Sequence, residues 1–143
     1  MAVCDVNEEA RTSFSRKHPT VPTYSDLDDL ISCHSLDFAV LAVPHCVHLE
    51  CCTILAKAGI PILKEKPVAA TWEEYRELCR LPVKIGVMFQ KRFEPRYQAL
   101  RNLLPQIGQV ASFRATLADN ITDLEATWRA DDDVGVTVCT PTH

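Results

Sequence analysis

The sequence lacks the features of several protein classes. Its net charge is -4 and it contains no run of basic residues, so a nucleic-acid partner is not expected. No apolar stretch approaches the roughly 20 residues that cross a bilayer, so neither a transmembrane helix nor a membrane partner is predicted. The N-terminus from Met1 to Asp5 lacks the basic start and long apolar core of a signal peptide. What remains is the ordinary balance of a soluble globular protein, with 47% hydrophobic and 24% charged residues.

Glycine is also scarce. The four glycines are Gly59, Gly86, Gly108 and Gly135. None of them forms a GxGxxG turn, which presents backbone N–H groups and a helix N-terminus to a pyrophosphate. The chain as written therefore lacks that phosphate anchor.

Cysteine, in contrast, is plentiful, with seven residues that lie mostly inside apolar segments. This placement favours reduced, buried thiols in a cytoplasmic protein over a disulfide scaffold. One cluster has the residue types of metal ligands at close spacing: His45, Cys46, His48, Cys51 and Cys52. No second ligand pair follows at the spacing of a zinc finger. We therefore favour a helix that packs on a sheet and predict no metal site.

Short apolar runs alternate with amphipathic stretches over residues 2–89. The expected strands are 2–5, 21–24, 37–43, 60–63 and 83–89, and the expected helices between them are 7–17, 25–33, 46–58 and 71–80. The strand at 37–43 is apolar throughout, as expected for a parallel strand that is buried on both faces. Helix caps are predicted at Asn7, at Ser25-Asp26 and in a capping box at Thr71 to Glu74. This order predicts an α/β fold with right-handed crossovers and a doubly wound, Rossmann-like parallel sheet.

The pattern changes after Arg92. Residues 94–104 favour a helix, which Pro105 stops. In residues 109–118 and 121–129 apolar and polar residues alternate, as in strands with one solvent-exposed face. We therefore expect two domains, at 1–92 and 93–143, and the second is expected to start an α+β arrangement.

The segment from Ala58 to Pro67 ends in Glu65-Lys66-Pro67 directly after an apolar strand. Four further segments occur in order around it, and they are Val3–Asp5, Val43–His48, Met88–Pro95 and Ile107–Val110. Together they resemble the Gfo/Idh/MocA family of glucose-fructose oxidoreductase and inositol dehydrogenase, over nearly the whole chain. The resemblance implies that 1–92 is a partial dinucleotide-binding domain and that 93–143 starts a C-terminal substrate or dimerisation domain. It also implies NAD(P)-dependent hydride transfer on a sugar, polyol or related hydroxyl compound.

Four residues follow predicted strand ends, and they are Asp5, Pro44, Glu65 and Gln90. Open α/β sheets bind ligands at this carboxyl edge. A carboxylate at Asp5 would accept hydrogen bonds from the adenosine ribose and repel a 2'-phosphate, which favours NAD over NADP. The alternative for Asp5 is a turn residue that only ends the strand.

The resemblance also assigns roles to single residues. Lys66 is expected to contact the substrate and to help the reacting hydroxyl lose its proton, and a cis Lys66-Pro67 bond fits this turn. His143 matches a catalytic histidine, although Cys139 stands where the family has an aspartate. The implied cofactor-binding residues are Asp5, Pro44, His45, His48, Glu65, Lys66, Gln90, Arg92, Trp128 and Arg129.

Simpler alternatives stay open for four of these residues. His48 is also typical of a helix residue that faces core or solvent. Glu65 and Lys66 also fit a solvated loop pair, and Arg92 also fits a surface salt bridge.

Compared with the family, the chain is truncated at both ends. The strand and glycine-rich turn that precede Val3 in the family are missing, and that strand lies between the second and fourth strands of such a sheet. Its neighbours must close up or leave backbone groups unpaired. We therefore expect an oxidoreductase that is impaired in this form. The alternative is a non-catalytic fragment or interaction module that pairs with a full-length relative or forms a homo-oligomer.

Overall fold

The structure is a computed structural model that describes residues 1–116. The chain divides into two compact units, Met1–Val87 and Met88–His143. In the described part of the chain, no helix is long and apolar enough to cross a membrane. The assignment of 1–92 to a cofactor domain and of 93–143 to a substrate domain remains a proposal.

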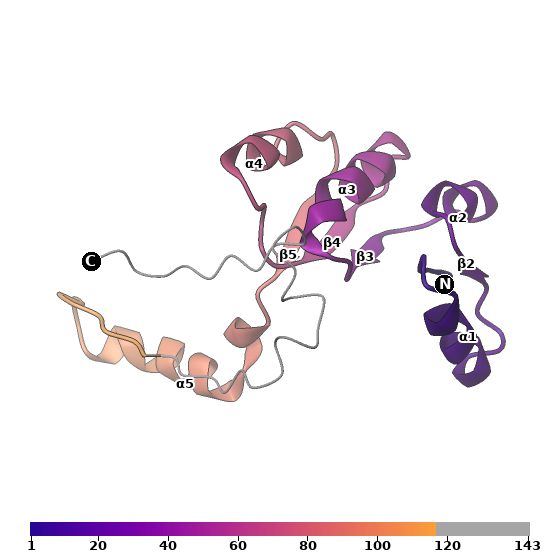
Figure 1. Cartoon of the computed structure of the whole chain (residues 1–143). Helices are drawn as coiled ribbons and strands as arrows, with labels where there is room; N and C mark the ends of the chain where they lie inside the picture. Colours follow the sequence, from indigo (N-terminus) through magenta and orange to yellow (C-terminus); the bar gives the residue numbers. More distant parts are fainter. Residues whose placement is uncertain (117–143) are drawn as a thin grey trace. The chain divides into compact units, whose positions relative to one another are not determined.

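Strands and helices alternate along the first unit in the predicted order (Figure 1). The strands are β1 (Val3–Cys4), β2 (Thr23–Tyr24), β3 (Ala39–Leu41), β4 (Ile62–Glu65) and β5 (Ile85–Met88), of which the last leads out of the unit. The helices are α1 (Glu8–Lys17), α2 (Leu27–Cys33), α3 (His48–Lys57) and α4 (Trp72–Leu78), and a short 3-10 turn η1 (His45–Val47) precedes α3.

The predicted helix caps form. The side chains of Asn7 and Asp26 accept hydrogen bonds from backbone N–H groups in the first turns of α1 and α2. The Thr71 hydroxyl accepts from the Glu74 amide over 3.2 Å, and the Glu74 carboxylate accepts from the Ala70 amide over 2.8 Å. These bonds satisfy backbone donors that a helix leaves without intrahelical partners, which explains why the helices begin at these residues.

The strands form two parallel sheets, as an incomplete Rossmann-like fold requires. One contains β1 and β2, and the other has the order β3-β4-β5. Val3 is paired with Thr23 in the first sheet, and Leu41 is paired with Lys64 in the second. Within the described residues no ladder joins β1 to β3. Of the two expected outcomes, the facing edges therefore stay unpaired instead of closing up.

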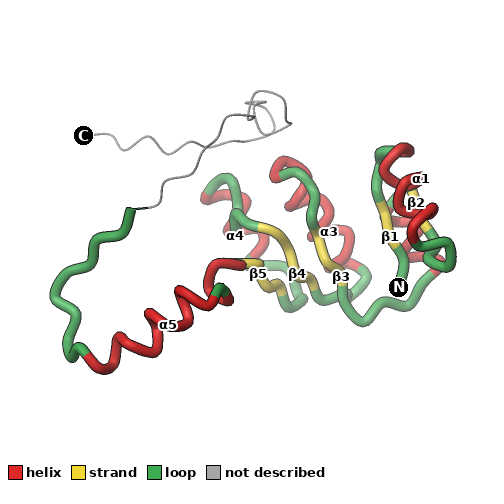
Figure 2. The backbone as a smooth tube through the Cα atoms, turned by 90° about the horizontal axis from the view of Figure 1, so that it is seen from below, coloured by secondary structure: helices red, strands yellow, loops and turns green. Residues whose placement is uncertain are grey.

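The core of the first unit lies between the three-stranded sheet and its helices. Figures 1 and 2 show α3 and α4 on one face of this sheet. The buried core residues are Leu41, Cys52, Leu55, Ile60, Ile62 and Leu78. No helix of this unit covers the other face, where Val40 is 54% exposed. The expectation that strand 37–43 is buried on both faces is therefore wrong, because helices pack on one face only.

The second unit begins with β5's last residue and is helical at first. It contains η2 (Gln90–Phe93), α5 (Pro95–Leu103) and η3 (Leu104–Gln106), in agreement with the helix predicted at 94–104. Residues 109–116 form no strand, contrary to expectation, because a strand requires a hydrogen-bonded neighbour and the described residues supply none. The strand expected at 121–129 lies outside the described residues, as do Trp128, Arg129, Cys139 and His143.

Candidate functional site

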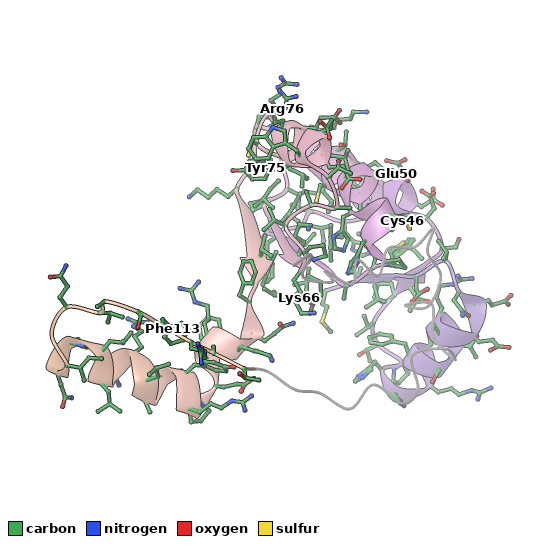
Figure 3. The ribbon with its side chains drawn as sticks, turned by 60° about the vertical axis from the view of Figure 1, so that its left-hand side comes forward. Cys46, Glu50, Lys66, Tyr75, Arg76 and Phe113 are labelled. Atoms are coloured by element: carbon green, nitrogen blue, oxygen red, sulfur yellow. The ribbon has the colours of Figure 1, made fainter. Side chains whose placement is uncertain are left out.

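The exit of β4 carries the tripeptide on which the family resemblance rests. Glu65 is the last residue of the strand, and Lys66 follows with an exposed side chain. The Lys66 amide donates to the Glu65 carboxylate over 3.2 Å, and the Lys66-Pro67 bond is cis, as predicted. Figure 3 shows Lys66 well away from Tyr75 and Arg76, which lie on α4. The Lys66 ammonium is therefore accessible to a ligand at the end of the sheet.

Lys64, one residue before Glu65, was not identified from the sequence as part of the site. It is fully buried, and its Nζ donates to the carbonyl oxygens of Glu65 over 3.2 Å, Pro67 over 2.5 Å and Val68 over 3.0 Å. The sequence did contain a signal for Lys64. Ile62 and Lys64 lie on the same face of the strand, and a lysine on a buried face requires polar partners.

The surroundings of Lys64 act on its charge in opposite directions. Burial lowers the pKa of Lys64, while the thiol of Cys52 on α3 and the carboxylate of Glu74 on α4 raise it to a smaller extent. The ammonium therefore lies within electrostatic reach of both helices that cover the sheet. Lys64 therefore joins the chain around the end of β4, by hydrogen bonds, to the core residue Cys52, by electrostatic interaction.

His48 occupies a comparable position after β3. Its side chain is 3% exposed, and its Nε2 donates to the carbonyl oxygen of Val43 over 3.0 Å. Burial lowers the pKa of His48 most strongly, and the nearby Lys64 ammonium lowers it further. The ring of His45 lies edge-on to that of His48, with 5.5 Å between centroids. This geometry favours the core-facing interpretation of His48, and its contact with a cofactor stays a prediction.

At the exit of β1 a guanidinium binds the backbone beside an exposed carboxylate. Asp5 is exposed, and its Oδ1 accepts from the Asn7 amide over 2.8 Å. Nη1 of Arg11 donates to the carbonyl oxygens of Asp5 over 2.7 Å and Val6 over 3.0 Å. Sequence reasoning missed Arg11, because its contact with Asp5 depends on how the turn between β1 and α1 folds.

The structure brings together the exits of β3 and β4. Leu41 and Lys64 are register partners in parallel strands, so Pro44 and Glu65 follow neighbouring strands at the same edge, as predicted. The negative charge of Glu65 also raises the pKa of His48. Asp5 follows a strand of the other sheet, so its grouping with these residues stays a prediction. No group of three His, Cys, Asp or Glu side chains within residues 1–116 has the arrangement of a metal site.

Gln90 and Arg92 belong to the second unit, and both are exposed. The Arg92 guanidinium lies 5.8 Å from the centroid of the Phe93 ring. A hollow of about 490 Å³ is lined by Arg92, Phe93, Gln98, Arg101 and Asn102. Two cations, Arg92 and Arg101, therefore line one hollow within this unit. A phosphate or substrate contact for Arg92 stays a prediction, beside the alternative of a surface salt bridge.

Comparison with known proteins supports one family. A family model described as an oxidoreductase family with an NAD-binding Rossmann fold matches residues 1–93. The chain is 28% identical over 119 residues to scyllo-inositol 2-dehydrogenase (NADP(+)) IolU of Bacillus subtilis, a match that covers 80% of this chain and 36% of that protein. It is 31% identical over 86 residues to the rhizopine catabolism protein MocA of Rhizobium meliloti, covering 57% of this chain and 27% of that protein.

Solved structures show the same fold. The WlbA dehydrogenase from Bordetella pertussis, in complex with NADH and UDP-GlcNAcA, matches with a TM-score of 0.67 and 26% identity over 74% of this chain and 33% of its own. Scyllo-inositol dehydrogenase from Lactobacillus casei, with bound NAD(H) and scyllo-inositol, matches with a TM-score of 0.68 and 20% identity over the same shares. The chain spans about a third of the length of these relatives. Because the family model covers well over half of a chain with this Rossmann-like fold, the chain belongs to the Gfo/Idh/MocA family of NAD-binding oxidoreductases.

Proposed function

We propose that this chain carries the cofactor-facing part of an oxidoreductase site that moves hydride between NAD(P) and a sugar or polyol hydroxyl. The observation that carries the proposal is the exposed Lys66 at the carboxyl edge of a Rossmann-like sheet, in a member of this family. The names of similar proteins support the substrate class, since they include inositol 2-dehydrogenases and a dehydrogenase with bound UDP-GlcNAcA.

Lys66 is the proposed catalytic residue. As hydride leaves a carbinol carbon, negative charge develops on the oxygen, and an ammonium beside that oxygen stabilises it and takes part in moving its proton. Lys66 Nζ is exposed and close in the chain to the Glu65 carboxylate, whose oxygen already accepts from the Lys66 amide. Glu65 would orient this turn or accept hydrogen bonds from ribose hydroxyls. Bound NAD(P) would supply or accept the hydride.

The residues present fit parts of a dinucleotide. Asp5 presents a carboxylate at the exit of β1, where it suits ribose hydroxyls, and Pro44 and His45 form the exit of β3. We propose NAD as the preferred cofactor, because the Asp5 carboxylate repels a 2'-phosphate. Arg11 acts against this preference, since its guanidinium lies beside Asp5 and would attract that phosphate. His48, Gln90 and Arg92, together with Trp128 and Arg129, complete the proposed cofactor-binding residues.

We propose that this chain alone binds the dinucleotide weakly, since its four glycines do not form a phosphate-binding turn. The unpaired edges of β1 and β3 favour a second candidate function, in which the chain pairs with another copy or with a longer relative through backbone hydrogen bonds. The six cysteines in residues 1–116 are free thiols, which supports the proposed cytoplasmic location.

An NMR titration of the ¹⁵N-labelled chain with NAD, and separately with NADP, tests the proposal. We expect saturable shift changes at the amides of Asp5, His45 and Lys66, with a dissociation constant above about 1 mM. A hydride-transfer assay with scyllo-inositol and myo-inositol tests the substrate class through absorbance of the reduced cofactor. Shift changes confined to residues outside the strand exits would contradict the proposed site. Light scattering that shows a monomer at all concentrations would contradict the pairing function.

A further inference from the structure

The lysine that precedes the catalytic tripeptide lies in an environment that is unusual for a charged side chain. Lys64 is fully buried on the face of β4 that packs against helices, beside core residues such as Ile62 and Cys52. Lysine is almost never fully buried unless its charge is paired. In residues 1–116 no carboxylate makes an ion pair with Nζ. The partners of this ammonium are therefore backbone carbonyl groups.

The ammonium has three N–H donors, and three carbonyl oxygens surround it. They belong to Glu65, Pro67 and Val68, at 3.2, 2.5 and 3.0 Å from Nζ. The acceptors are one, three and four residues further along the chain, so the backbone after β4 curls around a single buried cation. Hydrogen bonds from a charged donor are about twice as strong as neutral ones, which makes this arrangement stiff.

Lys66 lies inside the curled segment. The peptide carbonyl of Glu65 precedes it and the carbonyl of Pro67 follows it, and both point at the same Nζ. The Lys66 side chain itself is exposed and points to solvent. A flexible catalytic side chain acts efficiently only when its backbone is fixed, because a misplacement of about 1 Å can reduce the rate by about 100-fold.

We propose that Lys64 is a positioning residue, whose buried ammonium gathers the carbonyl groups of Glu65, Pro67 and Val68 and thereby fixes the backbone from which Lys66 reaches the substrate. This inference rests on the proposed function for the role of Lys66, but the fixing of the loop stands on the geometry alone. Lys64 contacts neither substrate nor cofactor in this role.

The Lys64→Met variant tests the proposal, because methionine keeps the linear shape and removes the three donors. Lys84→Met is the matched control, since Lys84 is exposed and lies beside β4, where its carbonyl oxygen accepts from the Ile62 amide. We expect hydrogen exchange at the Lys66 and Val68 amides to rise at least tenfold in Lys64→Met, while exchange at Cys52 and Leu55 in α3 changes by less than about twofold. Lys84→Met should leave all four amides unchanged.

Turnover provides the second readout. If the proposed hydride transfer is present, Lys64→Met should lower kcat by about 100-fold with little change in KM, because ground-state binding does not depend on the angle of Lys66. Unchanged exchange at Lys66 and Val68 would overturn the proposal whatever the activity. If the wild-type chain transfers no hydride, the proposed function fails, and the exchange data still decide the role of Lys64.

A third measurement tests the proposal even if Lys64→Met does not fold, because it uses the wild-type chain. The ammonium protons of Lys64 in the wild-type chain should then be visible by NMR as slowly exchanging signals near neutral pH, with couplings to three carbonyl carbons. An ammonium group that exchanges as fast as those of exposed lysines would overturn the proposal.

Discussion

His48 and Val43 are joined by a hydrogen bond of 3.0 Å, in which the ring nitrogen Nε2 donates to the backbone carbonyl oxygen. The bond ties the first residue of α3 to the chain that leaves β3, and the ring is buried behind it. Burial lowers the pKa of His48 and so favours the neutral ring, and the bond to Val43 then places its proton on Nε2.

The stability of the chain should decrease in mildly acidic solution because of His48. Burial lowers its pKa, so the unfolded chain binds the proton more readily than the folded chain. This contribution is fully present above the ordinary histidine pKa of about 6.5 and is lost as the pH falls toward the lowered value. Urea unfolding at pH 7.5 and 5.5 should show a smaller pH effect in His48→Gln than in the wild type. The exposed His18→Gln control should keep the wild-type difference; an equal loss in both variants would contradict the assignment.

Lys66→Met should remove hydride transfer without affecting the fold. Loss of a positioned acid–base group costs about 100- to 10,000-fold in kcat, and the Lys66 side chain is exposed, so its removal leaves packing unchanged. Steady-state kinetics and thermal unfolding measure the two effects separately. Lys91→Met, an exposed lysine in η2, is the control. Turnover of Lys66→Met within about twofold of the wild type would exclude Lys66 as the catalytic residue.

Asp5→Asn should shift the cofactor preference toward NADP. The substitution removes a charge that repels a 2'-phosphate and leaves the Arg11 guanidinium in place beside it. An exposed charge–charge interaction is worth up to about 1 kcal/mol, so the ratio of NADP to NAD affinity should rise by about fivefold. Titration of Asp5→Asn and of Asp28→Asn, an exposed acid of α2, checks this. A ratio that does not change would assign Asp5 to the strand-ending turn alone.

Leu55→Ala should be strongly destabilising, and Val40→Ala should not. Leu55 is fully buried in the core, where loss of its methyl groups leaves a cavity that costs about 2–5 kcal/mol. Val40 is 54% exposed on the face of the sheet that no helix of this unit covers, so its truncation should cost about 0.5 kcal/mol. Urea denaturation of both variants measures the difference. Equal costs would show that the exposed face of β3 is covered in solution.

Gly59→Ala should reduce stability through backbone strain alone. Gly59 ends the α3 turn with φ at +72°, and an added Cβ would meet no atom within 4 Å. The left-handed conformation costs an L-residue about 1–2 kcal/mol. Gly59→Asn should cost less, since asparagine tolerates this region better than alanine does. Thermal unfolding of the two variants gives the order, and an alanine variant as stable as the wild type would contradict the strain.

The amino-acid sequence by itself determined much of the local structure. Asn7, Asp26 and Thr71 cap helices as predicted, because a cap needs only a side chain and the N–H groups of the next few residues. The alternation of strands and helices followed from hydrophobic period, and the order of short motifs identified the family. The position of Lys66 after β4 also followed, since strand order and parallel register place such residues at one edge.

Only the tertiary structure decided which side chains are buried and what they contact. The apolar strand at 37–43 is covered on one face alone, because burial depends on which helices pack against it and not on its composition. Likewise, the sequence shows a lysine before Glu65, but not that Lys64 turns inward to three carbonyl groups. Such contacts join residues of different elements or bend the chain back on itself, and no local pattern encodes them. The tertiary structure thus gave a role to Lys64 beside the Lys66 that the sequence had already singled out.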